Sequence, residues 1–264
     1  MFRTVFLKTL RDQRRGLFGW SLGIAFLVFI EASIWPTMRD MDWNQLIQSY
    51  PEELRELFDL DAMTTGTGFM NAELFTLLLP GLFIVYAVAR GARLLAGEEE
   101  SGTLDVLLVT PVSGASIVLQ KALALATSLF VLGAVLFVVT LGSSALFDLG
   151  IGVAAAASGS LSMVLLGAEY GALALAVGAI TGRRAWAIGL ATVAAVAAYV
   201  LYAVGMLVEA VEPWQPLSPF HQALTGGPLG AGLASGYLWL AVVSVVAVLV
   251  AMPVPDRRDI AAHA

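Results

Sequence analysis

Residues 97–113 hold the densest group of charged, turn-forming and apolar side chains in the sequence. The segment opens with the acidic triplet Glu98–Glu100; Gly102 then permits a sharp turn, and Thr103 can cap the start of a helix. Leu104, Leu107 and Leu108, three and four residues apart, would form an apolar face of this helix. Asp105 would add one further acid, and Pro111 would end the helix. A short helix with an apolar face and acidic neighbours is suited to docking into another protein. The alternative is an ordinary acidic loop between two helices.

The sequence has no residues in the patterns typical of a nucleotide-binding or metal-binding site. A phosphate-binding loop needs a lysine directly after a glycine, and neither of the only two lysines, Lys8 and Lys121, follows one. There is no cysteine, and the two histidines, His221 and His263, are far apart in the sequence, so no zinc site or Ser/His/Asp arrangement is expected. We therefore predict that the chain is not itself an enzyme, and that it holds no metal or cofactor.

The composition places the chain in a lipid bilayer. It has 264 residues, of which 59% are hydrophobic and 13% charged, and the mean hydropathy is +0.85. Runs long enough to cross about 30 Å of hydrocarbon predict six spans. The spans cover roughly residues 17–35, 72–89, 117–141, 150–180, 185–208 and 233–252.

The distribution of charge gives these spans an orientation. Six spans place twelve of the fourteen basic residues on one side of the membrane, including Arg90, Arg93 and the pair Arg183–Arg184. The positive-inside rule makes that side cytoplasmic. Most of the acid falls in the first outer loop, between Asp40 and Asp61. We therefore expect a multi-pass protein of the cytoplasmic (inner) membrane with both termini in the cytoplasm.

The first sixteen residues alternate apolar and basic side chains at helical spacing. This pattern predicts an amphipathic helix over residues 1–16 that lies on the inner leaflet, with a frayed basic tail or a cleaved signal peptide as alternatives. The membrane-spanning domain would cover residues 17–252, and a cytoplasmic tail residues 253–264. The fold class expected is all-α, with six spans, this N-terminal helix and a short cytoplasmic helix within residues 97–113.

The same segment resembles the coupling segment of the type-2 ABC transporter permeases. That family carries an acidic pair or triplet, then Gly-Thr-Leu-acid, Leu-Leu and Pro-Val-Ser, which here are Glu98–Glu100, residues 102–105, residues 107–108 and residues 111–113. Gly114 departs from the pattern, since many relatives carry a basic residue there. The resemblance implies six spans, a coupling helix seated in a groove of an ATPase subunit, two such ATPases that bind ATP and Mg, and a second permease chain, identical or homologous.

Polar residues inside the predicted spans form a second group of candidates. Glu169 lies deep in the fourth span, where a carboxylate costs at least ~2.5 kcal/mol, so it faces either a transport cavity or an interhelical partner such as Tyr170. Glu31 lies near the outer end of the first span and can reach water. Two Gly-x-x-x-Gly pairs, Gly19 with Gly23 and Gly167 with Gly171, favour close helix contacts.

These observations predict the permease subunit of an ATP-driven exporter that moves a hydrophobic or amphipathic, drug-like or lipid-like substrate out of the cytoplasm. Membrane lipid is an expected partner and nucleic acid is not. The alternative is a stand-alone ion- or proton-coupled carrier that uses Glu169 and needs no ATPase. A membrane enzyme would need a cluster of reactive side chains that the sequence does not offer.

Overall fold

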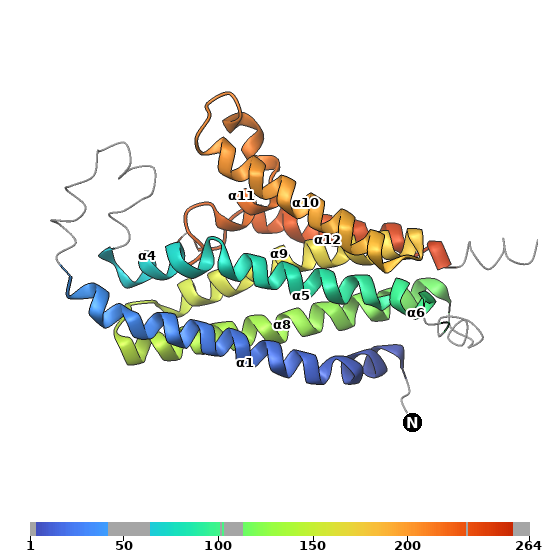
Figure 1. The fold of residues 1–264 in the computed structure, drawn as a ribbon, viewed down its shortest axis with the longest axis horizontal. Coiled ribbons are helices and arrows are strands. Elements are labelled where there is room, and N and C mark those ends of the chain that lie inside the picture. The colour runs from blue at the N-terminus through green and yellow to red at the C-terminus, as the bar shows by residue number, and fades with distance from the viewer. Residues whose placement is uncertain (1–3, 42–63, 101, 103–112, 231, 256–264) are drawn as a thin grey trace, which may run out of the picture.

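The computed structural model describes residues 4–41, 64–100, 102, 113–230 and 232–255, and within them the chain forms helices and no strand (Figure 1). The long helices are bundled roughly lengthwise, with α4 at one end and the short α6 at the other (Figure 1). Their bounds are α1 Val5–Arg39, α4 Gly66–Met70, η2 Asn71–Phe75, α5 Leu78–Leu94, α6 Ala96–Glu100, α8 Gly114–Phe147, α9 Val153–Thr181, α10 Arg184–Gly205, η3 Glu212–Leu217, α11 Pro219–Leu224 and α12 Gly236–Ala251.

Five helical stretches in the described residues are long and apolar enough to cross a membrane. Four of them are the single helices α1, α8, α9 and α10, and the fifth is the continuous stretch Gly66–Leu94, which includes α4, η2 and α5. The sixth predicted span contains α12, whose 16 residues rise about 24 Å and so fall short of the roughly 30 Å hydrocarbon core. The structure therefore supports an all-helical membrane protein with five such stretches, and the count of six stays a prediction.

Helix α9 occupies the centre of the bundle. It packs against α5, α8, α10 and α12, while α1 packs mainly on α8. Small residues make this possible: a Cβ at Gly91 of α5 would overlap the carbonyl oxygen of Gly171, and Gly167 lies against Leu129 and Phe83. Close backbone approach of this kind is how helices gain packing energy in lipid. The pair Gly167 and Gly171 thus serves contacts inside the chain.

The N-terminal segment differs from the sequence prediction. Residues 5–16 are the first part of α1, which runs without interruption to Arg39, and the Thr4 hydroxyl caps its start by accepting from the Leu7 N–H. No separate interfacial helix is present among the described residues. Basic residues that extend a helix beyond the apolar core produce the same alternation as a helix lying on the surface, so the placement of residues 5–16 on the inner leaflet stays a prediction.

The second helical stretch is irregular before α5. Pro80 lies in the first turn of α5, where proline is tolerated. The irregular part is the π-helical turn η2 and the residues after it, where Leu77 leaves helical geometry (φ −133, ψ −50). A π-helical turn widens the backbone and often marks a functional position.

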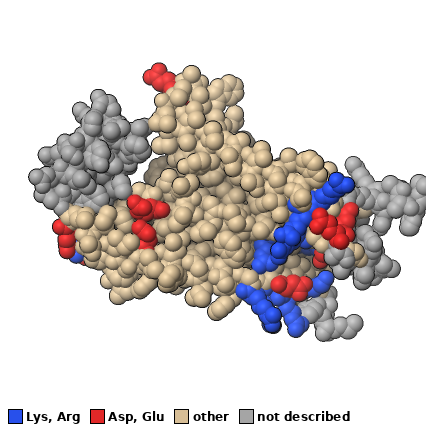
Figure 2. All heavy atoms as spheres, in the orientation of Figure 1, with Lys and Arg blue, Asp and Glu red and all other residues tan. Residues whose placement is uncertain are grey.

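Charge is divided between the two ends of the bundle (Figure 2). Lysine and arginine gather at the end where α1 begins and α5 finishes, which we name the basic end. Among the described residues only Arg39 lies at the opposite end, where it pairs with Asp148 at 3.4 Å. Successive long helices α1, α5, α8 and α9 run in alternating directions (Figure 1), and the side of the membrane that the basic end faces stays a prediction.

The central packing can be tested by adding one methyl group. We expect Gly91→Ala to lower the free energy of unfolding by about 1–3 kcal/mol, because the new Cβ meets the Gly171 backbone. Gly142→Ala in α8 is the control, since nothing lies within 4 Å of its added Cβ and helix propensity rises. Thermal unfolding of both purified variants in detergent measures the difference. Equal melting temperatures would contradict the close α5–α9 contact.

Candidate functional site

The acidic triplet lies on α6, directly after α5 and at the basic end. Gly102 follows with φ 68, a left-handed conformation that glycine adopts readily. The remaining predicted coupling residues lie outside the described residues: Thr103, Leu104, Asp105, Leu107, Leu108 and Pro111. Chain order thus runs from a membrane helix, through the triplet, into the predicted docking helix.

Glu98 joins three helices through charge. Its carboxylate accepts a hydrogen bond from the Lys121 ammonium of α8 and lies 3.7 Å from the Lys8 ammonium of α1. Lys121 is almost completely buried, with 1% of its side chain exposed, and also donates to the Leu94 carbonyl at the end of α5. Carbonyls at a helix C-terminus carry partial negative charge, so both partners stabilise the buried ammonium.

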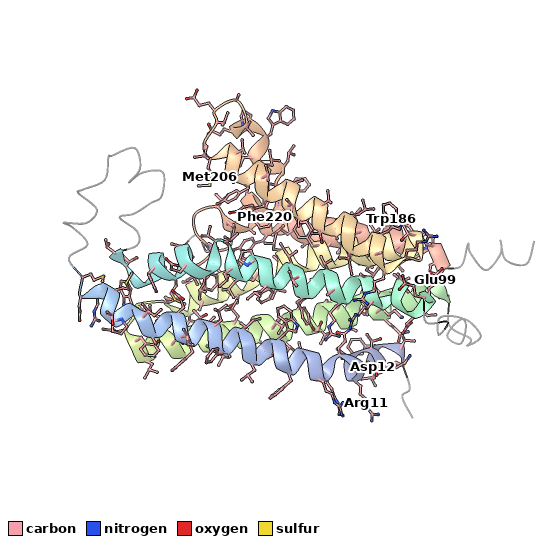
Figure 3. The ribbon with its side chains drawn as sticks, in the orientation of Figure 1. Arg11, Asp12, Glu99, Trp186, Met206 and Phe220 are labelled. Carbon is pink, nitrogen blue, oxygen red and sulfur yellow. The ribbon has the colours of Figure 1, made fainter. Side chains whose placement is uncertain are left out.

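Glu99 and Glu100 extend this contact to α9 and α10. The Arg184 N–H at the start of α10 donates to a Glu100 carboxylate oxygen at 2.8 Å, as an N-terminal capping group does. Gly182, in the left-handed conformation that ends α9 (φ 66), leaves room for the Glu99 carboxylate, which a Cβ would overlap. Figure 3 shows Glu99 at the same end of the molecule as Arg11 and Asp12.

We name Glu98, Glu99, Glu100 and Lys121 the acidic link. The acidic link joins α6 to α8, where Lys121 lies, and contacts α1 through Lys8 and α10 through the Arg184 N–H. The sequence singled out the three acids as neighbours of a docking helix, but not their contacts within the chain. Lys121 was missed as a site residue, although a lysine inside an apolar run is itself a signal that a partner exists.

The intramembrane candidates are buried to different degrees. Glu169 is 8% exposed, and its Oε2 has no hydrogen-bond partner among the described residues. The Tyr170 hydroxyl is also without a partner in that part of the chain, so the Glu169–Tyr170 hydrogen bond considered from sequence is not formed; the Tyr170 ring packs 6.3 Å from Phe220. Glu31 is half-buried in α1.

The segment between α10 and α12 folds back on the bundle as two short helical pieces, η3 and α11. Ser218 donates to the Ala198 carbonyl of α10 at 2.7 Å, and Ser162 of α9 donates to the Ala223 carbonyl at 2.6 Å. Partial burial lowers the pKa of His221 on α11 below its ordinary value, which favours the neutral ring at neutral pH.

The fold and the acidic link define a class of protein, a polytopic helical membrane protein whose charged residues gather at one end. The model of the family described as "ABC-2 family transporter protein" matches residues 3–255, which is nearly the whole chain. The chain belongs to this family of transporter permeases, whose members are membrane components and not catalytic subunits. A comparison with curated proteins finds no match.

The acidic link predicts an asymmetric response to mutation. Glu98→Gln leaves the buried Lys121 ammonium without its counter-charge and should cost roughly 2–3 kcal/mol, less than for a fully buried pair because Glu98 is partly exposed. Lys121→Met should cost less, since Glu98 keeps Lys8 and water. Melting temperatures of the single and double variants in detergent measure the effect.

The double variant provides the internal check. Adding Lys121→Met to Glu98→Gln should restore much of the lost stability, because the unpaired buried charge is gone. Glu209→Gln, an exposed acid at the opposite end, is the control and should melt like the wild type. A double variant that is as unstable as the sum of the two single ones would show that the pair is not coupled.

Proposed function

We propose that the chain is the membrane-spanning permease of an ATP-binding-cassette exporter, and that the acidic link passes force from separate ATPase subunits to the membrane helices. The observation that carries the proposal is that Glu98, at the entrance to the predicted coupling helix, is bonded to both α1 and α8. The family match supports the same class. The ion pairs of Glu98 and the family match support the proposal whatever the transported substrate is.

Rigidity at the start of the segment is what makes it a lever. If α6 were held only by its covalent connection, a displacement of the docking helix would bend the connection and go no further. Anchoring α6 to α8 by a buried ion pair and to α10 by the Arg184 N–H means that the same displacement acts on several helices together. The paired spans would then change from inward to outward access.

The assembly follows from this mechanism. Two ATPase subunits would bind ATP and Mg and close together, and two permease chains, identical or homologous, would form the path in the cytoplasmic membrane. The basic end would face the cytoplasm under the positive-inside rule, which places both termini there. A cargo that is hydrophobic or amphipathic suits the apolar interior, and export is the expected direction.

A stand-alone ion- or proton-coupled carrier is the second candidate. The observation in its favour is the buried carboxylate of Glu169, which has an oxygen without a partner in the described residues. Such a group in a membrane helix is often a site of proton or substrate binding. This carrier would work without an ATPase, whereas the family match favours the driven permease.

The docking role can be tested with the leucines of the predicted coupling helix. Leu104→Asp combined with Leu107→Asp should abolish copurification of the ATPase, because the apolar face that enters the groove becomes charged. Leu207→Asp, an exposed leucine at the opposite end of the bundle, is the control and should retain the ATPase. Retention by the double variant would refute docking through this segment.

Glu169→Gln separates the two candidate functions. In a driven permease the variant should keep ATPase-dependent transport, with at most a changed preference among substrates. In a proton-coupled carrier it should abolish the pH dependence of transport, because the amide cannot exchange a proton. Transport in proteoliposomes over a range of pH, with and without ATP, distinguishes these results.

A further inference from the structure

A seam runs between α1 and α5 and is open because neither helix packs closely on the other. Helix α1 packs mainly on α8, and α5 on α9. The two meet where the edge of Trp20 contacts the Tyr86 ring at 5.6 Å and where Arg90 lies against Gly16, leaving no room for a side chain there. The seam holds a groove and a pocket that follow one another along the same face of α1.

The groove is apolar and lies toward the middle of α1. Its volume is ≈ 640 Å³, within the usual 300–1,000 Å³ range of small-molecule sites, and no charged side chain lines it. Gly19 and Gly23 form part of its wall, opposite Leu82 of α5. Nothing lies within 4 Å of a Cβ added at either glycine, so the groove is empty space beside a bare helix backbone.

The pocket is polar, ≈ 230 Å³ in volume, and lies at the basic end of the same seam. Arg90 and Arg93 line it, and no carboxylate of the described residues forms an ion pair with either arginine. Gln13 also lines it; only 5% of this residue is exposed, and its Oε1 has no hydrogen-bond partner in the described part of the chain.

Two carboxylates in the pocket lower but do not cancel its positive charge. Glu98 already accepts from Lys121 and lies near Lys8, so its charge is engaged. Asp12 is exposed at the rim. Arg90 and Arg93 balance the two acids that line the pocket, and Lys8 and Lys121, which pair with Glu98 just outside it, leave the group of six charges net positive. An anionic group is therefore favoured there.

We propose that the seam binds one anionic phospholipid from the leaflet at the basic end, with an acyl chain in the apolar groove and the phosphate beside Arg90 and Arg93. The order of the two parts fits a lipid: the apolar groove lies deeper along the helices, and the cationic pocket lies where headgroups are found. The unpartnered Gln13 Oε1 is an acceptor, so it would bind a hydroxyl of the headgroup and not the phosphate. The proposal needs only that the helices lie in a membrane, so it is independent of ATPase binding.

Native mass spectrometry of the purified full-length chain tests this proposal. Phosphatidylglycerol and phosphatidylcholine with the same acyl chains are titrated separately, and the first should form a one-to-one adduct at lower concentration. Arg90→Gln and Arg93→Gln should each weaken that adduct about fivefold, the effect expected of one cation near an anionic lipid. Arg183→Gln, an exposed arginine at the same end but outside the seam, is the control.

Filling the groove gives a test that does not depend on the arginines. Gly19→Leu with Gly23→Leu should remove the adduct while leaving the melting temperature near that of the wild type, because both side chains enter open space. The matched control is Gly142→Leu with Gly189→Leu, two helical glycines that also have nothing within 4 Å of an added Cβ. The control should bind phosphatidylglycerol like the wild type.

Three results would overturn the proposal. Equal binding of phosphatidylcholine would show that the headgroup charge is not recognised. An unchanged adduct in the Gly19/Gly23 variant would place the lipid elsewhere. A change from dimer to monomer in that variant, with lipid binding retained, would show that a second copy of the chain occupies the groove.

Discussion

The buried ammonium of Lys121 is the constraint on which the basic end of the bundle depends. Removing such a charge from water costs several kcal/mol unless counter-charge and hydrogen bonds replace the solvent. Glu98 and the Leu94 carbonyl provide them, and both belong to the continuous stretch formed by α5 and α6. Lys121 can therefore stay buried only while α6 is seated against α8, which holds α6 in place at the end of α5.

The middle of the bundle is held in a different way. Central helix α9 makes polar contacts through Ser158 and Ser162 near its start, and further along its glycines, such as Gly171, allow the backbone of α5 to approach closely. Hydrophobic burial gives little preference for helix contact over lipid contact, so dispersion at this short distance has to supply it. Such close packing would let α5 and α9 move together, which the proposed transmission of force from the acidic link requires.

Sequence reasoning recovered features that are encoded locally and missed those that depend on distant contacts. Five of the six predicted spans correspond to long apolar helices, and these and the division of charge follow from hydropathy and from the positions of the arginines. The partners of the triplet do not, because Lys8 lies 90 residues before Glu98, and Arg184 is separated from Glu100 by 84 residues. No local sequence pattern indicates the π-helical turn η2. Helix α12 is short because it begins at Gly236, three residues after the start of the predicted span at residue 233.

Glu98 connects the two functions assigned to the basic end. It belongs to the acidic link, and it also lines the polar pocket of the α1–α5 seam. A displacement of α6 that moves Glu98 changes the charge that the pocket presents to a phosphate. By linkage, a lipid that binds one position of α6 more tightly favours that position to the same degree. The lipid in the seam would then set the resting equilibrium on which an ATPase acts, through a carboxylate that both sites share.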